Sequence, residues 1–381
     1  MADIMISSIP HGGHEAQLLG LASELVRRGH TVTFVTTPRR AGQVRALGAD
    51  ALEYHSPLTG DDPSADRDED LSAVLPRLLR EAKAVLPVME HEWSGRLPEC
   101  VLVDVLAWGG TIFARKHRIL DIQTWPIFAS NEAFSLEQRY DQSYSDVSVL
   151  EEFYRDLTDF AEKAGSPDAA DYLFTGADRN IVFMPREFQY SGDTFDERYV
   201  FVGPCPLRAG RAGHGERDWQ VLVSMGTAHD RGPAFFRDCA TALADVPGRV
   251  LMLTGGCVSP EDLPDLPANI EVRDWAEQFT VLERARAFVT HGGMNSVMEA
   301  LYHAVPMVVI PDRVEQIANA DRVAGLGLGL RIAGAGQLRN AVRHVMSDAA
   351  VRGRLAEMRA AVQAAGGAVA AADAVEKWMR G

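Results

Sequence analysis

The sequence has few cysteines, and it contains neither a recognisable signal peptide nor a long apolar run. Its 381 residues include only four cysteines, and because no two form a Cys-x-x-Cys pair, no metal knuckle is predicted. We expect the cysteines to be small buried thiols in a reducing compartment. The amino terminus has no basic segment ahead of a long apolar run, and no apolar run approaches the roughly 20 residues that cross a bilayer. The sequence therefore predicts a cytoplasmic protein.

Positive charge is scarce. The chain has 38 Lys and Arg residues against 53 Asp and Glu residues, which gives a formal net charge of -15 at pH 7. Such a surface repels nucleic acid and anionic lipid, so we expect neither as a partner, while a homodimer stays open. The composition, with 46% hydrophobic and 24% charged residues, is typical of a globular enzyme, and the length suits two domains.

Two nucleotide-binding motifs are also missing. The chain contains neither the GxGxxG dinucleotide fingerprint nor the GxxxxGK[ST] phosphate loop, which excludes a standard NAD site and a P-loop kinase. The acidic segment 58–72 does contain two Asp-x-Asp pairs, Asp66/Asp68 and Asp68/Asp70. Such pairs can hold a divalent metal beside a nucleotide diphosphate, but these do not close an apolar strand. We interpret them as a solvated charge run in a loop and expect no metal site.

The chain begins as a β–α–β unit. An apolar strand over 4–9 leads into the turn "PHGGH", and the following helix carries an apolar face made by Leu18, Leu21, Ala22 and Leu25. A second strand is predicted at 31–36, and the helical connection implies that the two strands are parallel. Further strands are predicted at 100–106, 122–128, 180–184 and 199–203.

A second α/β pattern starts after residue 218. The segment 204–218 is rich in Pro, Gly and Arg, which indicates a linker. A strand and turn at 219–227 and strands at 249–255, 286–291 and 306–311 then alternate with helices. We therefore predict an α/β protein of two Rossmann-like, doubly wound domains facing each other across a cleft. The domains are 1–203 and 219–365, and the Ala-rich segment 366–381 forms a final helix that can pack back on the first domain.

The stretch "THGGMNSVME" (290–299) follows an apolar strand and precedes a helix that we expect to start near Asn295. Ligands of open α/β sheets bind at this edge, where free backbone N–H groups and the helix dipole favour an anion. His291, Asn295 and Ser296 add side-chain donors. A second glycine turn, with Gly226 and Thr227, also follows a strand. The alternative, a capped turn without a ligand, stays open on these residues alone.

Two long segments resemble a known family. Residues 273–323, "RDWAEQFTVLERARAFVTHGGMNSVMEALYHAVPMVVIPDRVEQIANADRV", look like the donor-binding signature of GT-B fold, family 1 glycosyltransferases, and residues 10–36 are similar to that family's acceptor-domain motif. The resemblance is greatest to the bacterial branch that decorates antibiotics and other natural products. It implies transfer of a sugar, expected to be a thymidine-diphosphate-linked deoxysugar, to a nucleophile of a hydrophobic aglycone. The nucleotide sugar is a substrate, and no cofactor or metal is implied.

The resemblance also implies roles for individual donor-site residues. The base would contact Trp275, with Gln278 and Val281 nearby. The diphosphate would contact the glycine turns and the helix start, namely Gly226, Thr227, His291, Gly293, Met294, Asn295 and Ser296. Glu299 would bind the ribose, and Glu315 with Gln316 the sugar hydroxyls. Taken singly, each residue has a structural alternative such as a core position, a solvated helix face or a helix cap; their order at the family's spacing favours the binding roles.

The same resemblance implies a general base with a carboxylate partner. His14 occupies the family's base position, counted back from "RRGH", and Asp104 matches the partner aspartate. An imidazole suits this task because its pKa lies near working pH. His11 is the rival, because the turn contains an extra residue and Gln17 stands where the family often has proline. The implied chemistry is direct, inverting displacement at the anomeric carbon.

Fewer residues support the prediction of an acceptor-binding surface, and other functions also have to be considered. Trp108, Trp125, Phe128 and Phe134 lie near predicted strand ends and could form an apolar wall for an aglycone. A nucleotide-sugar epimerase on the same fold is the alternative enzyme. A catalytically silent helper and a small-molecule binding protein are the alternatives without catalysis.

Overall fold

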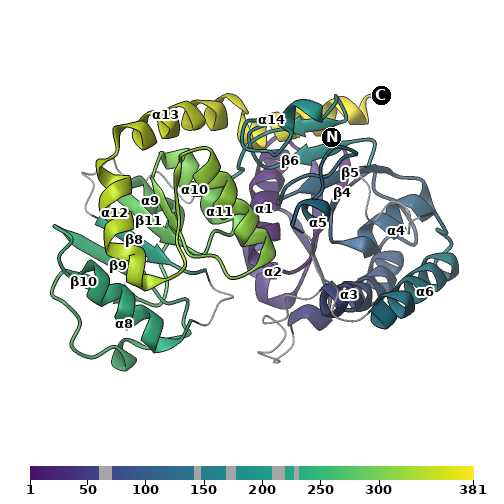
Figure 1. Ribbon diagram of the computed structural model, residues 1–381. Helices are drawn as coiled ribbons and strands as arrows, with labels where there is room; N and C mark the ends of the chain where they lie inside the picture. The colour runs from purple at the N-terminus through teal and green to yellow at the C-terminus, as the bar shows by residue number, and fades with distance from the viewer. Residues whose placement is uncertain (60–70, 141–146, 169–176, 208–218, 227–230) are drawn as a thin grey trace. The chain divides into compact units, whose positions relative to one another are not determined.

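The computed structural model describes residues 1–59, 71–140, 147–168, 177–207, 219–226 and 231–381 (Figure 1). The chain divides into two compact units, Met1–Leu207 with Ala365–Gly381, and Arg208–Ala364. Within the described ranges, no helix combines the length and the hydrophobicity that a membrane span requires. The Asp-x-Asp pairs, Thr227 and residues 208–218 of the expected linker lie outside those ranges.

The first unit contains a seven-stranded sheet in the order β3-β2-β1-β4-β5-β6-β7, with every neighbouring pair parallel. The strands are β1 (Asp3–Ser7), β2 (Thr31–Thr36), β3 (Asp50–Glu53), β4 (Cys100–Asp104), β5 (Leu120–Trp125), β6 (Asn180–Val182) and β7 (Tyr199–Phe201). The helices are α1 (Gly12–Arg27), α2 (Pro38–Ala46), α3 (Leu71–Glu92), α4 (Trp108–His117), α5 (Leu136–Tyr140), α6 (Val147–Lys163) and α14 (Gly367–Met379), with short 3₁₀ helices η1 (Pro57–Thr59) and η2 (Gly192–Thr194).

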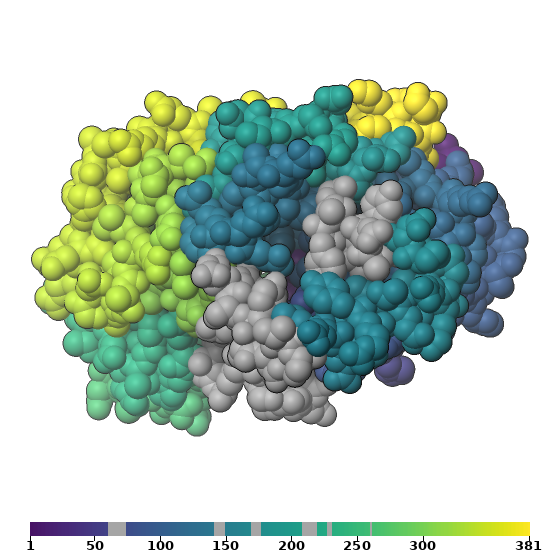
Figure 2. All heavy atoms as spheres, turned by 45° about the vertical axis from the view of Figure 1, so that its right-hand side comes forward, coloured from purple at the N-terminus to yellow at the C-terminus, as the bar shows by residue number. Residues whose placement is uncertain are grey.

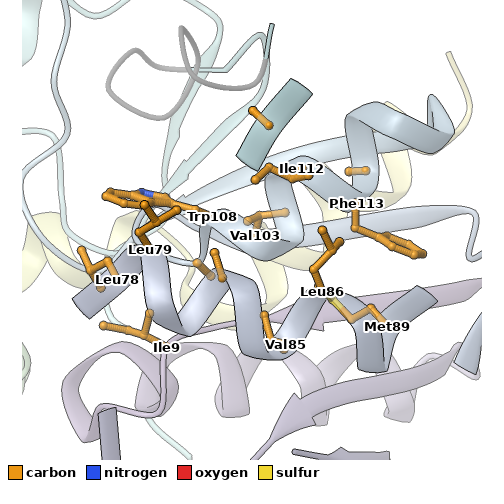
Figure 3. Packing of buried hydrophobic residues seen from close by; sticks show 14 of the residues in the cluster. Ile9, Leu78, Leu79, Val85, Leu86, Met89, Val103, Trp108, Ile112 and Phe113 are labelled. Atoms are coloured by element: carbon orange, nitrogen blue, oxygen red, sulfur yellow. The ribbon is translucent and has the colours of Figure 1, made fainter. Parts of the chain in front are cut away.

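Two apolar clusters cover the two faces of this sheet. Met5 of β1 belongs to one cluster, and its neighbours Ile4 and Ile6 belong to the other, because successive strand side chains point to opposite faces. The first cluster packs α3, α4 and α6 on the sheet. Figure 3 shows its contact between Leu78, Leu79, Val85, Leu86 and Met89 of α3 and Trp108, Ile112 and Phe113 of α4.

The second cluster joins α1 to the carboxyl-terminal helix. The predicted apolar face of α1, from Leu18 to Leu25, is fully buried there, together with Ala371 and Val375 of α14. In the space-filling view, the yellow carboxyl-terminal residues at the upper right lie at the surface beside purple and blue residues of the first unit (Figure 2). The Ala-rich end thus forms α14, and Gly366 and Gly367 at its start have φ of 86° and 58°, which favours glycine.

The second unit contains a six-stranded parallel sheet in the order β10-β9-β8-β11-β12-β13. Its strands are β8 (Trp219–Ser224), β9 (Arg249–Leu253), β10 (Ile270–Arg273), β11 (Ala285–Thr290), β12 (Met307–Val309) and β13 (Gly329–Arg331). Its helices are α8 (Gly232–Leu243), α9 (Gln278–Glu283), α10 (Met294–His303), α11 (Val314–Gly325), α12 (Leu338–Ser347) and α13 (Ala349–Ala364), with 3₁₀ helices η3 (Pro260–Asp262) and η4 (Ala335–Gln337). One core cluster packs α8 and α12 on this sheet.

Each sheet reverses its strand order beside its first strand. The reversal lies between β1 and β4 in the first unit and between β8 and β11 in the second. In open α/β sheets the connections diverge at such a point, which leaves a crevice at the carboxyl ends of the two strands where ligands bind. The topology therefore marks one candidate site in each unit.

Candidate active site

In the first unit, the reversal brings His14 against Asp104. Strand β1 pairs with β4, so the turn after β1 lies beside Asp104, the last residue of β4. Helix α1 begins at Gly12 and places His14 in its first turn. The distance between His14 Nδ1 and Asp104 Oδ2 is 2.8 Å, with side-chain exposures of 12% and 0%. The two residues that the sequence named are therefore in contact.

The second oxygen of Asp104 fixes the orientation of the pair. Asp104 Oδ1 accepts a hydrogen bond of 2.9 Å from the backbone N–H of Leu106. A carboxylate held in this way keeps the proton of His14 on Nδ1, so Nε2 is the ring atom that can accept another proton. The arrangement can also stabilise an imidazolium. It has the chemistry of a general base with an orienting carboxylate.

His11 and Gln17 occupy other places in this turn. His11 is the N-cap residue of α1, and its ring lies edge-on to His14 with 5.7 Å between the ring centroids. Gln17 is buried, and its Oε1 accepts a 2.5 Å hydrogen bond from the backbone N–H of Cys205. The residue that departs from the family's proline thus ties α1 to the segment after β7.

In the second unit, the reversal brings two glycine turns around His291. The ring of His291, 8% exposed, follows β11. A Cβ on Gly226, after β8, would lie 2.9 Å from its Cε1, and one on Gly293 would lie 2.6 Å from its Nε2. Gly226 also has a φ of 79°. Only glycine fits both positions, so the two turns close tightly on the imidazole.

Helix α10 starts directly after these glycines. Its N-cap is Gly293, and no side chain of the described residues caps it, so its first N–H groups point outward and favour an anion. Met294, the first helical residue, is 4% exposed, and Ser296 is 8% exposed. The helix begins one residue before the predicted start.

A polar network connects Ser296 to Glu299. Gln278 Nε2 donates to Ser296 Oγ at 3.1 Å and to Glu299 Oε2 at 2.7 Å, and Asn295 Nδ2 donates to Glu299 Oε1 at 3.1 Å. Burial raises the pKa of Glu299 to about 7, although the Gln278 hydrogen bond acts in the opposite direction. Glu299 is therefore a carboxylate whose charge changes near neutral pH.

Two of the three residues predicted near the base, Trp275 and Val281, border a pocket. Trp275 is 67% exposed, and with Val281 it lines a hollow of about 450 Å³ in the second unit. The other lining residues are Trp219, Arg249, Arg273, Ala276, Glu277, Thr280 and Arg284. An exposed indole beside a hollow of this size can stack on a planar ring.

The predicted sugar-binding residues lie in the first turn of α11. Gln316 Oε1 accepts from the backbone N–H of Asp312 at 3.1 Å, and Asn319 Nδ2 donates to Glu315 Oε1 at 3.1 Å. Asn319, which is fully buried, also donates to the carbonyl of Gly292 at 2.8 Å. It therefore connects the α11 turn to the His291 turn.

Sequence reasoning missed Asn319 and Arg231. The signal for Asn319 was its spacing, four residues after Glu315 on a helix. Arg231 Nη2 lies 2.9 Å from the carbonyl oxygen of Ile310 and 3.1 Å from Asp312 Oδ2, so it connects the start of α8 to the segment before α11. No local motif marks such a long-range pair.

The expected acceptor wall is corrected by the structure. Trp108 and Phe128 are 1% exposed, and Trp125 and Phe134 are 4% exposed. Trp108 packs between α3 and Phe153, while Phe128 stacks on Phe188 and contacts Phe134. These aromatic residues gain more by completing the core than by facing solvent, so they do not form an exposed wall.

Comparisons with known proteins agree with this architecture. A family model described as UDP-glucoronosyl and UDP-glucosyl transferase matches residues 203–358. The NDP-glycosyltransferase YjiC of Bacillus subtilis (strain 168) is 34% identical over 394 residues, which cover 99% of this chain and 97% of the relative. Demethyllactenocin mycarosyltransferase of Streptomyces fradiae is 34% identical over 398 residues, which cover 99% of this chain and 86% of the relative.

A solved structure matches both units. The crystal structure of CalG4, the calicheamicin glycosyltransferase, has a TM-score of 0.85 and 32% sequence identity, and the match covers 100% of this chain and 98% of that one. The predicted pair of Rossmann-like domains is thereby confirmed as the GT-B fold. With a full-length relative at 34% identity, the chain belongs to family 1 of the GT-B glycosyltransferases, in its bacterial natural-product branch.

Proposed function

We propose that this glycosyltransferase moves a sugar from a nucleoside diphosphate to a nucleophile of a hydrophobic natural-product acceptor, with inversion at the anomeric carbon. The observation that carries the proposal is the 2.8 Å contact between His14 and Asp104 at the strand reversal of the first unit. The glycine turns around His291, at the corresponding reversal of the second unit, support a diphosphate site.

The base step follows from the His14 geometry. Nδ1 donates to Asp104, and Nε2 takes the proton of the acceptor hydroxyl as that oxygen attacks the anomeric carbon. The new bond to the acceptor oxygen forms as the bond from the anomeric carbon to the phosphate oxygen breaks. Asp104 stabilises the imidazolium that results. One displacement from the side opposite the leaving group inverts the anomeric configuration.

The leaving diphosphate is stabilised by the second unit. The first N–H groups of α10 and the donors of His291 and Ser296 face the charge that develops on it. Because these groups supply the positive potential, we propose that the reaction needs no metal ion. Glu299 accepts from the ribose hydroxyls, Trp275 stacks on the base, and Glu315 with Gln316 binds the sugar.

The donor nucleotide is proposed to be thymidine diphosphate. This nucleotide is what the resemblance to the antibiotic-decorating branch implies. Similarity to the mycarosyltransferase of Streptomyces fradiae and to the oleandomycin glycosyltransferase of Streptomyces antibioticus, 32% identical over 395 residues, supports membership of that branch. A ligand that binds only the folded state raises the melting temperature. Thymidine diphosphate should therefore raise it more than uridine diphosphate does at equal concentration.

His291→Ala and Ser296→Ala should each weaken thymidine diphosphate binding about 10- to 150-fold. Each removes a hydrogen-bond donor to a charged group, worth roughly 1.5–3 kcal/mol. Isothermal calorimetry of the two variants measures the change. His344→Ala and Ser347→Ala, which alter the same residue types at the end of α12, are the matched controls. Unchanged affinity in both site variants would mean that the His291 turn only connects β11 to α10 and binds no diphosphate.

A further inference from the structure

Glu15 is a second buried carboxylate beside the proposed base. It follows His14 in the first turn of α1 and is 2% exposed. Its Oε1 accepts from Thr36 Oγ1 at 3.1 Å, and its Oε2 lies 3.2 Å from Arg40 Nε. The helix dipole favours an acidic residue in a first helical turn, but Glu is almost never fully buried unless it is paired, so the burial of Glu15 beside Thr36 and Arg40 requires an explanation.

The position of His14 in the same helical turn explains why a buried carboxylate is useful there. A first helical turn carries the positive end of the helix dipole, which disfavours an imidazolium. A base at this place becomes stronger only if negative charge nearby outweighs that potential. Asp104 provides one such charge through direct contact, and Glu15 provides another from the adjacent residue.

The titratable groups near Glu15 and His14 come from α2, β4, the turn before α1 and the segment after β3. Arg40 lies on α2, where it also packs against Gly12, since a Cβ there would be 3.2 Å from its Nη2. Asp104 ends β4, and His11 precedes α1. Tyr54 follows β3 and donates to Glu81 of α3; burial, Glu81 and Glu15 together raise the pKa of Tyr54.

Glu15 and His14 are electrostatically coupled. The pKa of Glu15 lies above its usual value, because burial and the nearby Asp104 raise it by more than Arg40, the Thr36 hydrogen bond and His14 lower it. Arg40 is the strongest of the groups that favour the charged carboxylate, and a charged carboxylate at this position in turn favours the charged imidazole.

We propose that Glu15, held by Thr36 and Arg40, is a positioning residue for catalysis whose negative charge strengthens His14 as a base. This inference rests on the proposed function, because it requires His14 to accept the acceptor's proton. It assigns the Glu15–Thr36–Arg40 contacts to proton transfer, in addition to their part in holding α1 on the sheet.

Two substitutions separate charge from shape. Glu15→Gln keeps the size and the bond to Thr36 but removes the charge, so the acidic limb of the kcat profile should move to a pH lower by about one. The plateau rate should fall by up to about tenfold, because a weaker base transfers the proton less well. Glu15→Asp keeps the negative charge on a shorter side chain. The acidic limb of its kcat profile should therefore stay near the wild-type pH.

The pH dependence of kcat in wild type, Glu15→Gln, Glu15→Asp and Glu81→Gln tests the proposal. Glu81→Gln is the matched control, because it neutralises another buried carboxylate of the first unit, 4% exposed, and should leave the limb in place. Either of two results would overturn the proposal, because a role in shape alone gives both. In the first, the acidic limb of Glu15→Gln stays within about 0.2 pH of wild type. In the second, the acidic limb of Glu15→Asp moves as far as that of Glu15→Gln.

The His14→Ala variant distinguishes a failure of the proposed function from a failure of the Glu15 inference alone. If His14→Ala transfers sugar at a near-normal rate, the proposed base is wrong and the Glu15 inference falls with it. If His14→Ala is inactive while Glu15→Gln keeps the wild-type limb, only the Glu15 inference falls. Thermal unfolding of each variant, measured beside the rates, shows that the folded fraction is equal.

Discussion

His14→Ala should lower the rate of sugar transfer by about 10²–10⁴, the usual contribution of a positioned general base. The fold and nucleotide binding should stay near wild type, because His14 contacts Asp104 in the first unit, whereas the residues proposed to bind the diphosphate belong to the second. Steady-state kinetics and calorimetry on the same preparation measure the two effects. His11→Ala, which removes the neighbouring ring of the same turn, should cost much less.

Asp104→Asn shows whether the two residues act together. The amide keeps the shape but cannot stabilise the imidazolium, so this variant should also be slow. If the pair is one unit, the double variant should be little slower than His14→Ala alone, since effects within a unit do not add. Losses that multiply would assign Asp104 to the turn around Leu106 instead. A fast His14→Ala enzyme beside an inactive His11→Ala enzyme would reverse the assignment of the base.

Glu299→Gln should stabilise the protein at pH 8 by up to about 3 kcal/mol and leave its stability at pH 4 almost unchanged. The pKa of Glu299 is raised to about 7 from 4.5, so the folded state favours the neutral carboxyl. That contribution is fully present below pH 4.5 and is lost as the pH rises through 7, because stability changes by about 1.4 kcal/mol for each pH unit between the two pKa values. Chemical unfolding of the two proteins at both pH values measures the difference.

The same substitution should remove a pH dependence of nucleotide binding. If the ribose hydroxyls donate to the ionised carboxylate, the wild-type affinity should rise as the pH passes 7, and Glu299→Gln should bind more weakly with that component of the rise gone. Comparison with the variant cancels the titration of the nucleotide's own phosphate. A pH dependence that is the same in both proteins would place the ribose away from Glu299.

The sequence predicted those parts of the fold that short-range periodicity determines. The strand at 31–36 has the predicted bounds, and the apolar face of α1 is buried as expected. The meeting of His14 with Asp104 was also predictable, because parallel strands joined by helices bring their carboxyl ends to one edge. The family spacing then indicated which histidine to choose.

Other features depend on contacts that no local pattern encodes. The burial of Trp108 requires α3 and α6, and a tryptophan near a strand end has the same local sequence whether it faces solvent or core. Gln17 looked like a departure from a motif, yet it binds the backbone 188 residues away at Cys205. Arg231 and Glu15 are likewise defined by partners distant in sequence, and only the folded chain shows them.

The most direct test of the account is a transfer assay with the wild-type enzyme in excess chelator, with and without a hydrophobic aglycone, followed by determination of the anomeric configuration of the product. The account predicts acceptor-dependent release of nucleoside diphosphate, undiminished by the chelator, and a glycoside of inverted configuration. Retained configuration, a rate that collapses until magnesium or manganese is restored, or conversion of the nucleotide sugar to an epimer without acceptor would contradict it.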